Sequence, residues 1–278
     1  MPLMSAKSRS THGVLPITGL LLVSVLLLAP RPGHSADPKT APAAPSAAAS
    51  AIADQVMTAL GGKPAWDGTH YLRFTFAGRR THHWDKWTGR HRLEGTTQDG
   101  KKYVVLENIN THEGQAWLDG KKVEGDELKT WLDRGYGAWV NDTYWLLMPY
   151  KMKDPGVNLE SAGTEQIDGK TYDKLHLTFG KVGLTPGDQY WAYINRDTHL
   201  MDRWAYLLQD QPRDAAPTAW LWQGWHKVGK IMLAPDRTQV GADRKLPLAD
   251  LAVFDTLPDA VFTSPDPVAA EAPKPKKK

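Results

Sequence analysis

The chain has 278 residues, with 34 Lys and Arg against 31 Asp and Glu, and it contains no cysteine. The missing cysteine excludes disulfides, thiol nucleophiles, cysteine-ligated metal centres and lipidated cysteine. With 41% hydrophobic and 23% charged residues, the composition is that of a globular protein and not of a chain disordered throughout. A serine hydrolase would depend on Ser161, because the other serine after Ser50 lies in the proline-rich C-terminal stretch.

The first 36 residues have the order of regions that is typical of a secretory signal. Basic residues precede an apolar run from Val14 to Leu28, and small residues follow up to Ala36. The run has about 15 residues, whereas a membrane-spanning helix needs about 20. We therefore expect residues 1–36 to be a signal peptide that is cleaved after Ser35 or Ala36, and the protein to be periplasmic. The alternative is an uncleaved N-terminal anchor.

The remaining chain is predicted to be one domain between two flexible segments. Removing residues 1–36 takes away three basic residues and no acidic one, which leaves 31 of each sign. A balanced chain lacks the excess of Lys and Arg that nucleic-acid binding needs. Residues 37–50 are predicted to be a flexible Ala/Pro linker, residues 51–263 the domain, and residues 264–278 a disordered Pro/Lys tail.

The domain is predicted to begin with a helix and to continue as a series of antiparallel strands. Ile52, Val56 and Leu60 recur at helical spacing before a Gly-Gly stop. Apolar and polar residues then alternate, with Asp-Gly pairs at 99–100 and 119–120 that suit tight turns. The predicted strands are 71–76, 81–87, 90–94, 103–106 and 115–118.

The middle of the chain is predicted to be helical up to Pro149. Asp126 is a suitable N-cap, and apolar residues follow it at helix-like spacing. Gly135 and Gly137 are expected to divide this stretch into two helices, with a cap for the second near Asn141-Asp142. The helical residues expected to face the sheet are Trp139, Val140, Tyr144 and Leu147.

The alternation of a sheet returns after Asn158. The predicted strands are 174–179, 189–194, 201–208, 219–225, 231–233 and 251–254. Roughly ten short strands form an antiparallel sheet too large to stay flat. The predicted fold class is therefore mainly β, an α+β arrangement in which a curled antiparallel sheet or incomplete β-barrel is covered by helices.

Two of these strands, at 190–194 and 219–222, are apolar on both faces. A sheet with one face in water shows regular alternation, so a second layer has to cover these strands. The predicted helices are that layer, and an apolar cavity is expected between them and the sheet. Twelve tryptophans against five phenylalanines supply large rings with one N–H each for such a boundary.

The chain shows no pattern typical of catalysis or metal binding. His82 and His83 point to opposite faces of a strand, so we do not expect them to share a metal ion. No two carboxylates are spaced for acid–base catalysis, and the sequence has no phosphate loop or dinucleotide fingerprint. We therefore expect a protein that is not an enzyme and has no cofactor.

Three stretches resemble a LolA-like group of exported bacterial proteins, which is related to the periplasmic lipoprotein carrier LolA. They are His83–Arg92, Trp139–Lys151 and Asp154–Val157. The resemblance covers most of residues 51–263. It implies an incomplete antiparallel barrel closed by helices over a lipid-accepting cavity.

The leading hypothesis is a periplasmic carrier or binding protein for a lipid, a lipoprotein acyl chain or another amphiphile. The alternative is an exported glycan-binding module or an enzyme of unknown reaction; enclosed rings favour the lipid and an exposed row of rings the glycan. We expect a monomer that binds a lipid or lipidated protein, has a membrane-bound transfer partner and binds no nucleic acid. The expected ligand-binding residues are Phe74, Phe76, Trp84, Trp139, Tyr144, Leu147, Trp191, Tyr193, Trp220 and Trp222.

Overall fold

The computed structural model describes residues 46–268. Its helices are α1 (Ala47–Ala59), α2 (Lys63–Asp67), α3 (Gly125–Leu147), the 3-10 helix η1 (Met148–Tyr150) and α4 (Ala260–Thr263). Within this part of the chain, none of the helices combines the length and the hydropathy that crossing a bilayer requires. The predicted signal peptide, most of the predicted linker and the end of the predicted tail lie outside the described residues.

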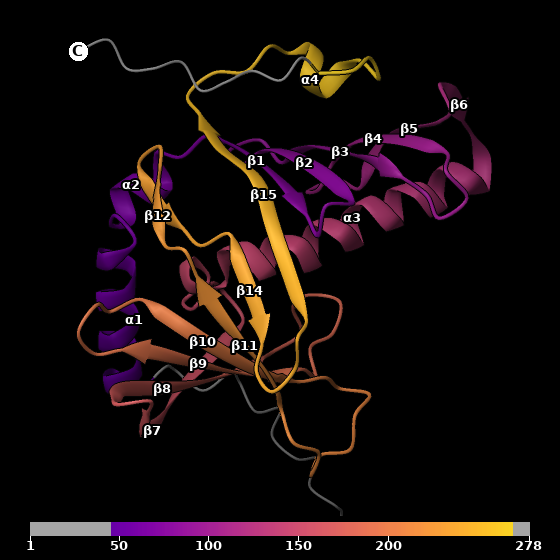
Figure 1. Cartoon of the computed structure of the whole chain (residues 1–278). Coiled ribbons are helices and arrows are strands. Elements are labelled where there is room, and N and C mark those ends of the chain that lie inside the picture. Colours follow the sequence, from indigo (N-terminus) through magenta and orange to yellow (C-terminus); the bar gives the residue numbers. More distant parts are fainter. Residues whose placement is uncertain (1–45, 269–278) are drawn as a thin grey trace, which may run out of the picture. The chain divides into compact units, whose positions relative to one another are not determined.

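Most strands belong to one antiparallel sheet of 13 strands (Figure 1). From edge to edge their order is β6-β5-β4-β3-β2-β1-β15-β14-β11-β10-β9-β8-β7. The first half-sheet contains β1 (Tyr71–Phe76), β2 (Arg80–Asp85), β3 (Arg90–Thr96), β4 (Lys102–Asn108), β5 (Glu113–Leu118) and β6 (Lys121–Val123). The second half-sheet contains β7 (Val157–Ile167), β8 (Lys170–Phe179), β9 (Gln189–Asn195), β10 (Met201–Leu207), β11 (Thr218–Gln223), β14 (Asp236–Gln239) and β15 (Lys245–Phe254). β12 (His226–Val228) and β13 (Ile231–Leu233) form a separate hairpin.

The path of the chain explains this strand order. The chain starts in the centre of the sheet and meanders outward from β1 to β6. Helix α3 and η1 then lead to β7 at the opposite edge, and a second meander returns to β15 beside β1. The result is the curled antiparallel sheet with a helical cover that the alternation predicts.

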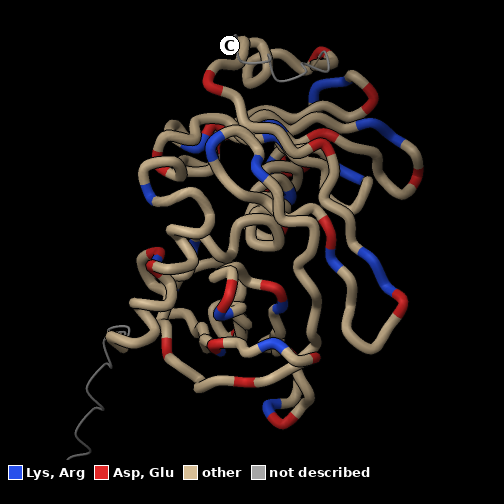
Figure 2. The backbone as a smooth tube through the Cα atoms, turned by 60° about the vertical axis from the view of Figure 1, so that its left-hand side comes forward, with Lys and Arg blue, Asp and Glu red and all other residues tan. Residues whose placement is uncertain are grey.

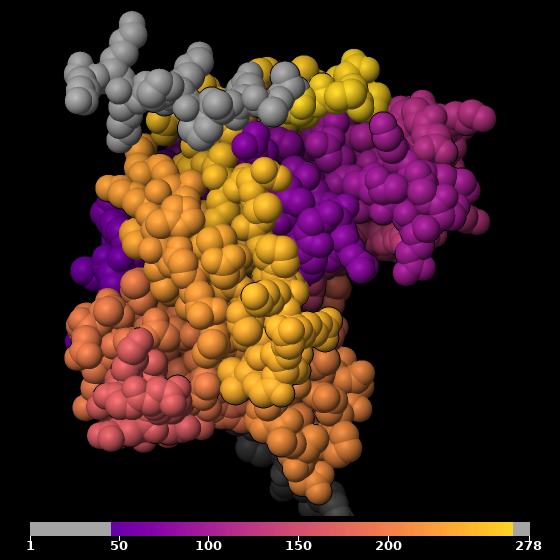
Figure 3. Space-filling view, in the orientation of Figure 1, coloured from indigo at the N-terminus to yellow at the C-terminus, as the bar shows by residue number. Residues whose placement is uncertain are grey.

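Strand β15 joins the two half-sheets. Its residues 245–247 pair with β14, and its residues 248–254 pair with β1. The pairing with β1 contains a register shift, and Asp250 at this place has a φ of 54°. Such a bulge bends a strand and increases its twist. In the space-filling view the yellow strand lies between the purple first half-sheet and the orange second half-sheet (Figure 3).

Helix α3 packs on both half-sheets. Its N-terminal half contacts β4 and β5, where Trp131 joins Leu93, Val105 and Ala116 in one cluster. Its C-terminal half joins α1, η1 and the second half-sheet in the main core. The two halves of α3 therefore face two different apolar clusters.

Helix α4 lies against β3 and β4.

Both predicted flexible segments are shorter than expected. Helix α1 begins at Ala47, so the linker prediction is wrong for 47–50. The Ser46 side chain caps this helix by accepting a hydrogen bond from the Ala49 backbone N–H (3.2 Å), and Ala49 is buried. At the other end, the buried Arg92 donates to the backbone carbonyls of Ser264 and Asp266. These polar contacts attach to the domain two stretches whose composition is typical of linkers.

Helix α3 is continuous, so the predicted break at Gly135 and Gly137 is wrong. Gly135 serves a close approach instead, because a Cβ atom there would lie 2.4 Å from Glu107 Oε1 and 3.0 Å from Val105 Cγ1. The predicted cap near Asn141-Asp142 is also wrong, since both residues lie within the helix. Val140 is half-buried and belongs to none of the core clusters of the described residues.

The two glycines of α3 provide a matched test of this close approach. Gly135→Ala adds a Cβ that collides with Glu107 and Val105, so we expect the free energy of unfolding to fall by about 1–3 kcal/mol. Gly137→Ala meets Leu184 Cδ1 at 3.8 Å, an ordinary contact, and the better helix propensity of alanine should raise stability by up to about 1 kcal/mol. Urea denaturation of both variants measures the difference. Equal effects would contradict the close approach at Gly135.

Candidate functional site

An aromatic interior lies where the C-terminal half of α3 meets the second half-sheet. Trp145 of α3 is at its centre, with ring centroids 4.8 Å from Trp204 and 5.2 Å from Trp220. Tyr144, the preceding residue, lies 5.0 Å from Tyr190. These contacts are edge-on, which is a favourable arrangement for aromatic pairs. The interior is therefore a continuous group of rings contributed by α3, β9, β10 and β11.

Eight of the ten predicted ligand-binding residues belong to this main cluster or pack against it. They are Phe74, Phe76, Trp84, Trp139, Tyr144, Leu147, Trp220 and Trp222. Trp220 and Trp222 are each 1% exposed, so these rings are enclosed and do not form an exposed row. The structure therefore places these eight residues in or against the main apolar cluster, and their role in ligand binding stays a prediction.

Trp191 and Tyr193 lie on the other face of the sheet, so their predicted place in the cavity is wrong. They cluster with Tyr172 and Ala205, and the Trp191 ring stacks on His176 at 5.0 Å. Side chains of a strand alternate between faces. In β9 the residues between them, such as Tyr190, point to the interior instead.

Four residues described in this region were not predicted, namely Trp145, Tyr190, Trp204 and Arg237. A signal existed for Trp204, because it shares one face of its strand with Tyr206 two residues later. Trp145 is adjacent to Tyr144 in the helix, and both contact the sheet because rings from several strands surround the helix end. Arg237 had no sequence signal, since an arginine in a short strand is normally exposed.

The interior contains hydrogen-bond donors without protein partners. Within the described residues, the buried indole N–H groups of five tryptophans and the hydroxyl of Tyr144 have no hydrogen bond. Trp204, Trp220 and Trp222 belong to the aromatic interior, whereas Trp84 of β2 packs against Trp139 on the side of the first half-sheet. Each buried donor left unpaired costs about 1–3 kcal/mol. Burial also raises the pKa of Tyr144 well above its usual value, so its hydroxyl stays a donor.

Arg237 brings a guanidinium into the same region. It is 1% exposed, and its Cζ lies 3.5 Å from the centroid of the Trp222 ring. It donates to the backbone carbonyls of Ala234 (2.9 Å) and Trp145 (2.7 Å). The Trp145 carbonyl is in the last turn of α3, where the helix dipole favours a cation. Burial lowers the pKa of Arg237 well below its usual value. Arg237 therefore attaches the end of α3 to β14.

A buried polar chain attaches the middle of α3 to the first half-sheet. Asp142 of α3 accepts hydrogen bonds from both Nε (2.5 Å) and Nη2 (2.6 Å) of Arg80. His82 Nε2 lies 2.8 Å from the same carboxylate, and its Nδ1 lies 3.0 Å from His91 Nε2. His91 Nδ1 is in turn 3.0 Å from Glu107 Oε1. Five side chains from α3, β2, β3 and β4 are thus connected in series.

The protonation of this chain follows from its hydrogen bonds. Burial lowers the pKa of His82 to about 4, so the ring is neutral at pH 7. It donates from Nε2 to Asp142 and accepts at Nδ1 from the Nε2–H of His91. Each neutral ring carries one N–H, and these two protons are used in the contacts between His82 and Asp142 and between His91 and His82. The third contact, between His91 and Glu107, therefore needs one further proton. The side chains of His82, His91, Asp142 and Glu107 are fully buried. The polar chain therefore helps to fix the position of α3 on the sheet.

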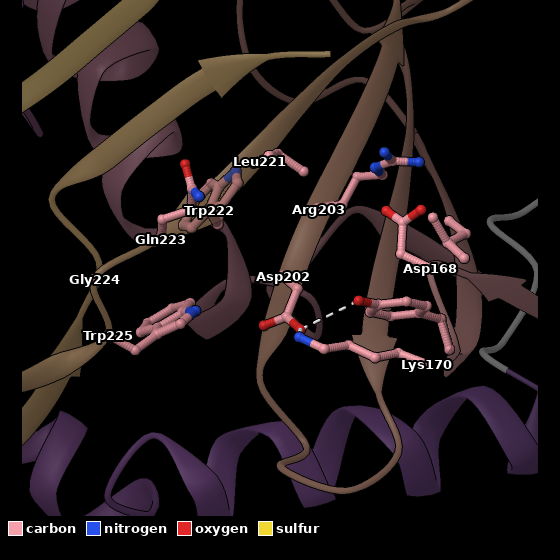
Figure 4. Close-up of a pocket in the computed structure, with 11 residues that line it drawn as sticks. Asp168, Lys170, Asp202, Arg203, Leu221, Trp222, Gln223, Gly224 and Trp225 are labelled. Carbon is pink, nitrogen blue, oxygen red and sulfur yellow. Dashed lines mark hydrogen bonds and ion pairs between the residues drawn. The ribbon is translucent and has the colours of Figure 1, made fainter.

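A cavity of about 340 Å³ opens beside the interior, at the ends of β10 and β11 (Figure 4). Trp222 and Trp225 lie on one side of it, and Asp202 and Lys170 lie toward the other side (Figure 4). Asp202 accepts a hydrogen bond from the Tyr172 hydroxyl at 3.4 Å. Trp222 belongs to the interior and also lines this cavity, whereas Ile167 and Tyr172 place part of the cavity wall on the other face of the sheet.

No family model matches the chain, and neither does any curated protein. Among solved structures, the chain is similar to a DUF1329 family protein from Desulfovibrio piger, with 14% identity, 77% of this chain and 96% of that chain covered, and a TM-score of 0.42. It is also similar to an outer membrane lipoprotein-sorting protein domain from Vibrio parahaemolyticus (10% identity, 76% and 94% covered, TM-score 0.40). A third is a LolA superfamily protein from Nitrosomonas europaea (11% identity, 78% and 97% covered, TM-score 0.34).

The names of these structures include the superfamily that the sequence resembles. All three identities are below 25% and all three TM-scores are below 0.5. The function proposed below therefore rests on the residues of this chain.

The ion pair between α3 and the sheet can be tested with two aspartates of the same helix. Asp142→Asn removes the charge that binds Arg80 and His82, and breaking a buried pair costs about 3–5 kcal/mol. We expect the lower end of this range, because the Arg80 side chain is 29% exposed. Asp133→Asn breaks an exposed pair with Lys129 and should cost less than about 1 kcal/mol. Chemical denaturation at pH 7.5 compares the variants; a similar loss in both would contradict the role of Asp142.

The buried histidines predict a loss of stability in acid. Burial lowers the pKa of His82 to about 4 and that of His83 to about 3, whereas an unfolded histidine titrates near 6.5. The unfolded state therefore binds more protons as the pH falls from 6.5 toward 4, and the free energy of unfolding falls by roughly 3 kcal/mol for His82 alone. Denaturation at pH 7.5 and pH 5.0 measures this slope. His83→Gln should make it shallower, and a slope of zero would contradict the neutral buried rings.

Proposed function

We propose that the protein binds a lipid, an acyl chain or another amphiphile in the aromatic interior beneath the C-terminal half of α3. The unpartnered indole N–H groups of the interior carry this proposal. A core selected for stability alone would use phenylalanine at these positions, because its ring needs no hydrogen bond. A ligand with a long apolar part and a few ester or carboxylate oxygens suits both the rings and their donors.

Hydrophobic burial would supply most of the affinity. Each CH₂ group removed from water contributes about 0.8 kcal/mol, so a partly buried acyl chain binds without covalent chemistry. The N–H groups of Trp204 and Trp222 would then orient the oxygen atoms. Movement of α3 relative to the second half-sheet would admit longer ligands.

The enclosed position of the rings supports an amphiphile over a glycan. Sugar-binding rings lie in an exposed row, whereas Trp204, Trp220 and Trp222 are each 1% exposed. Export to the periplasm, a monomeric state and a membrane-bound partner for ligand transfer belong to the same proposal.

A pair of conservative tryptophan variants tests this site. Trp204→Phe keeps an aromatic side chain, although a smaller one, and removes one N–H, and it should weaken binding of a fluorescent fatty acid by about two- to tenfold, the effect of one hydrogen bond. Trp191→Phe changes the opposite face of the sheet and should leave the affinity unchanged. The measurement is a fluorescence titration of delipidated protein, together with mass spectrometry of co-purified lipid.

Two results would contradict the proposal. One is the absence of both saturable probe binding and co-purified lipid in a folded protein. The other is an equal loss of affinity in both variants, which would place the probe outside the interior.

A further inference from the structure

A second cavity, of about 570 Å³, lies between the N-terminal half of α3 and strands β2–β5. It is distinct from the aromatic interior, because its apolar walls include Leu93, Tyr103 and Trp131 of the first half-sheet cluster. None of the ten predicted ligand-binding residues lines it. Its volume is in the range of clefts that bind small molecules. The cleft is therefore a separate candidate site.

The cleft carries an excess of positive charge. Four cations line it, Arg79, Arg80, Lys101 and Arg134, against one carboxylate, Asp99, which pairs with Lys101 at 3.0 Å. Within the described residues, Arg79 and Arg134 form no ion pair. Basic and acidic residues are interspersed along the chain (Figure 2). The excess of positive charge in the cleft arises because the fold brings the β1–β2 turn and α3 together here.

The donors of these arginines point to one kind of ligand. Arg80 uses Nε and Nη2 for Asp142, and its Nη1 has no hydrogen bond within the described part of the chain. The Arg134 guanidinium lies over the Trp131 ring, with its Cζ 4.7 Å from the centroid, and this contact restricts its position. Guanidinium groups recognise planar or tetrahedral oxyanions with two N–H groups at once. Three guanidiniums around one cleft suit a phosphate, which has several terminal oxygens.

The wall beside the arginines is aromatic. The rings of Tyr103 and Trp131 have centroids 5.1 Å apart. A Cβ atom at Gly95 would lie 2.7 Å from the Tyr103 hydroxyl, so glycine at this position lets the phenol lie against β3. Burial raises the pKa of Tyr103, and the charges of Arg80 and Arg134 act against this increase. An anion here would have a flat apolar surface next to it.

We propose that this cleft binds a phosphate monoester whose phosphate contacts Arg79, Arg80 and Arg134 and whose organic part lies against the half-buried Tyr103. The phosphate belongs either to a soluble molecule or to a lipid headgroup, and both present the same terminal oxygens. The proposal does not depend on the function proposed for the aromatic interior, because the two sites share no residue.

Isothermal titration calorimetry with phenyl phosphate at low ionic strength tests the cleft in the intact protein. We expect saturable 1:1 binding that weakens as salt is added. Arg134→Gln removes one charged donor, and the loss of a charge-assisted hydrogen bond should weaken binding about tenfold or more. Inorganic phosphate should bind more weakly than phenyl phosphate, because it lacks the ring.

Arg244 provides the control, since it is exposed and lies over a tryptophan ring, Trp220, but outside the cleft. Arg244→Gln should leave the affinity for phenyl phosphate unchanged. Circular dichroism checks that both variants are folded. The proposal is overturned if phenyl phosphate shows no saturable binding, if Arg134→Gln binds it as well as the unaltered chain does, or if both variants lose affinity equally.

Vesicles distinguish the two sources of the phosphate. Binding to phosphatidic acid vesicles that depends on Arg134, in addition to phenyl phosphate binding, assigns the site to a lipid headgroup. Phenyl phosphate binding without vesicle binding assigns it to a soluble phosphate ester. Either result supports an oxyanion site in the cleft, and neither tests the aromatic interior, for which the Trp204→Phe titration is the separate measurement.

Discussion

Helix α3 has to lead from one edge of the sheet to the other, because the two meanders end and begin at opposite edges. A flat sheet of 13 strands would be about 58 Å wide at the usual strand spacing, whereas the 23 residues of α3 measure about 35 Å. Residues 151–156 after the helix form turns and add little length. A helix of this length therefore fits a curled sheet and not a flat one, and the bulge in β15 lies where the half-sheets join.

Directional contacts hold α3 in its register on this curled sheet. Apolar packing alone is non-directional, so a ring-lined surface tolerates several positions of a helix. The close approach at Gly135, the Arg80–Asp142 pair and the Arg237 bond to the Trp145 carbonyl each allow one position. They contact the middle and the end of the helix from both half-sheets. Arg80 also lines the charged cleft, so the same side chain belongs to the attachment of α3 and to the second candidate site.

The aromatic interior is costly for the fold. Within the described residues, the buried indole N–H groups of Trp204, Trp220 and Trp222 have no partners and each cost about 1–3 kcal/mol, which together is a large part of the stability of a typical domain. The large apolar area of the rings offsets this cost, since each buried aromatic side chain contributes about 1.5–3 kcal/mol. The balance leaves an interior that is apolar in area yet supplied with donors.

The sequence by itself indicated most of the strands and several of their turns, because period-two alternation and Asp-Gly turns are local signals. It did not predict β6, β7 or β14, and it predicted only the end of β15. Among the interior rings it identified Tyr144, Trp220 and Trp222. It did not determine which face of a strand points inward where both faces are apolar, and this is why Trp191 and Tyr193 were misplaced. The partner of Asp142, the use of Gly135 and the burial of Arg237 depend on contacts such as Arg80–Asp142, 62 residues apart. The tertiary structure decided these, since they exist once α3 and β15 bring the two half-sheets together.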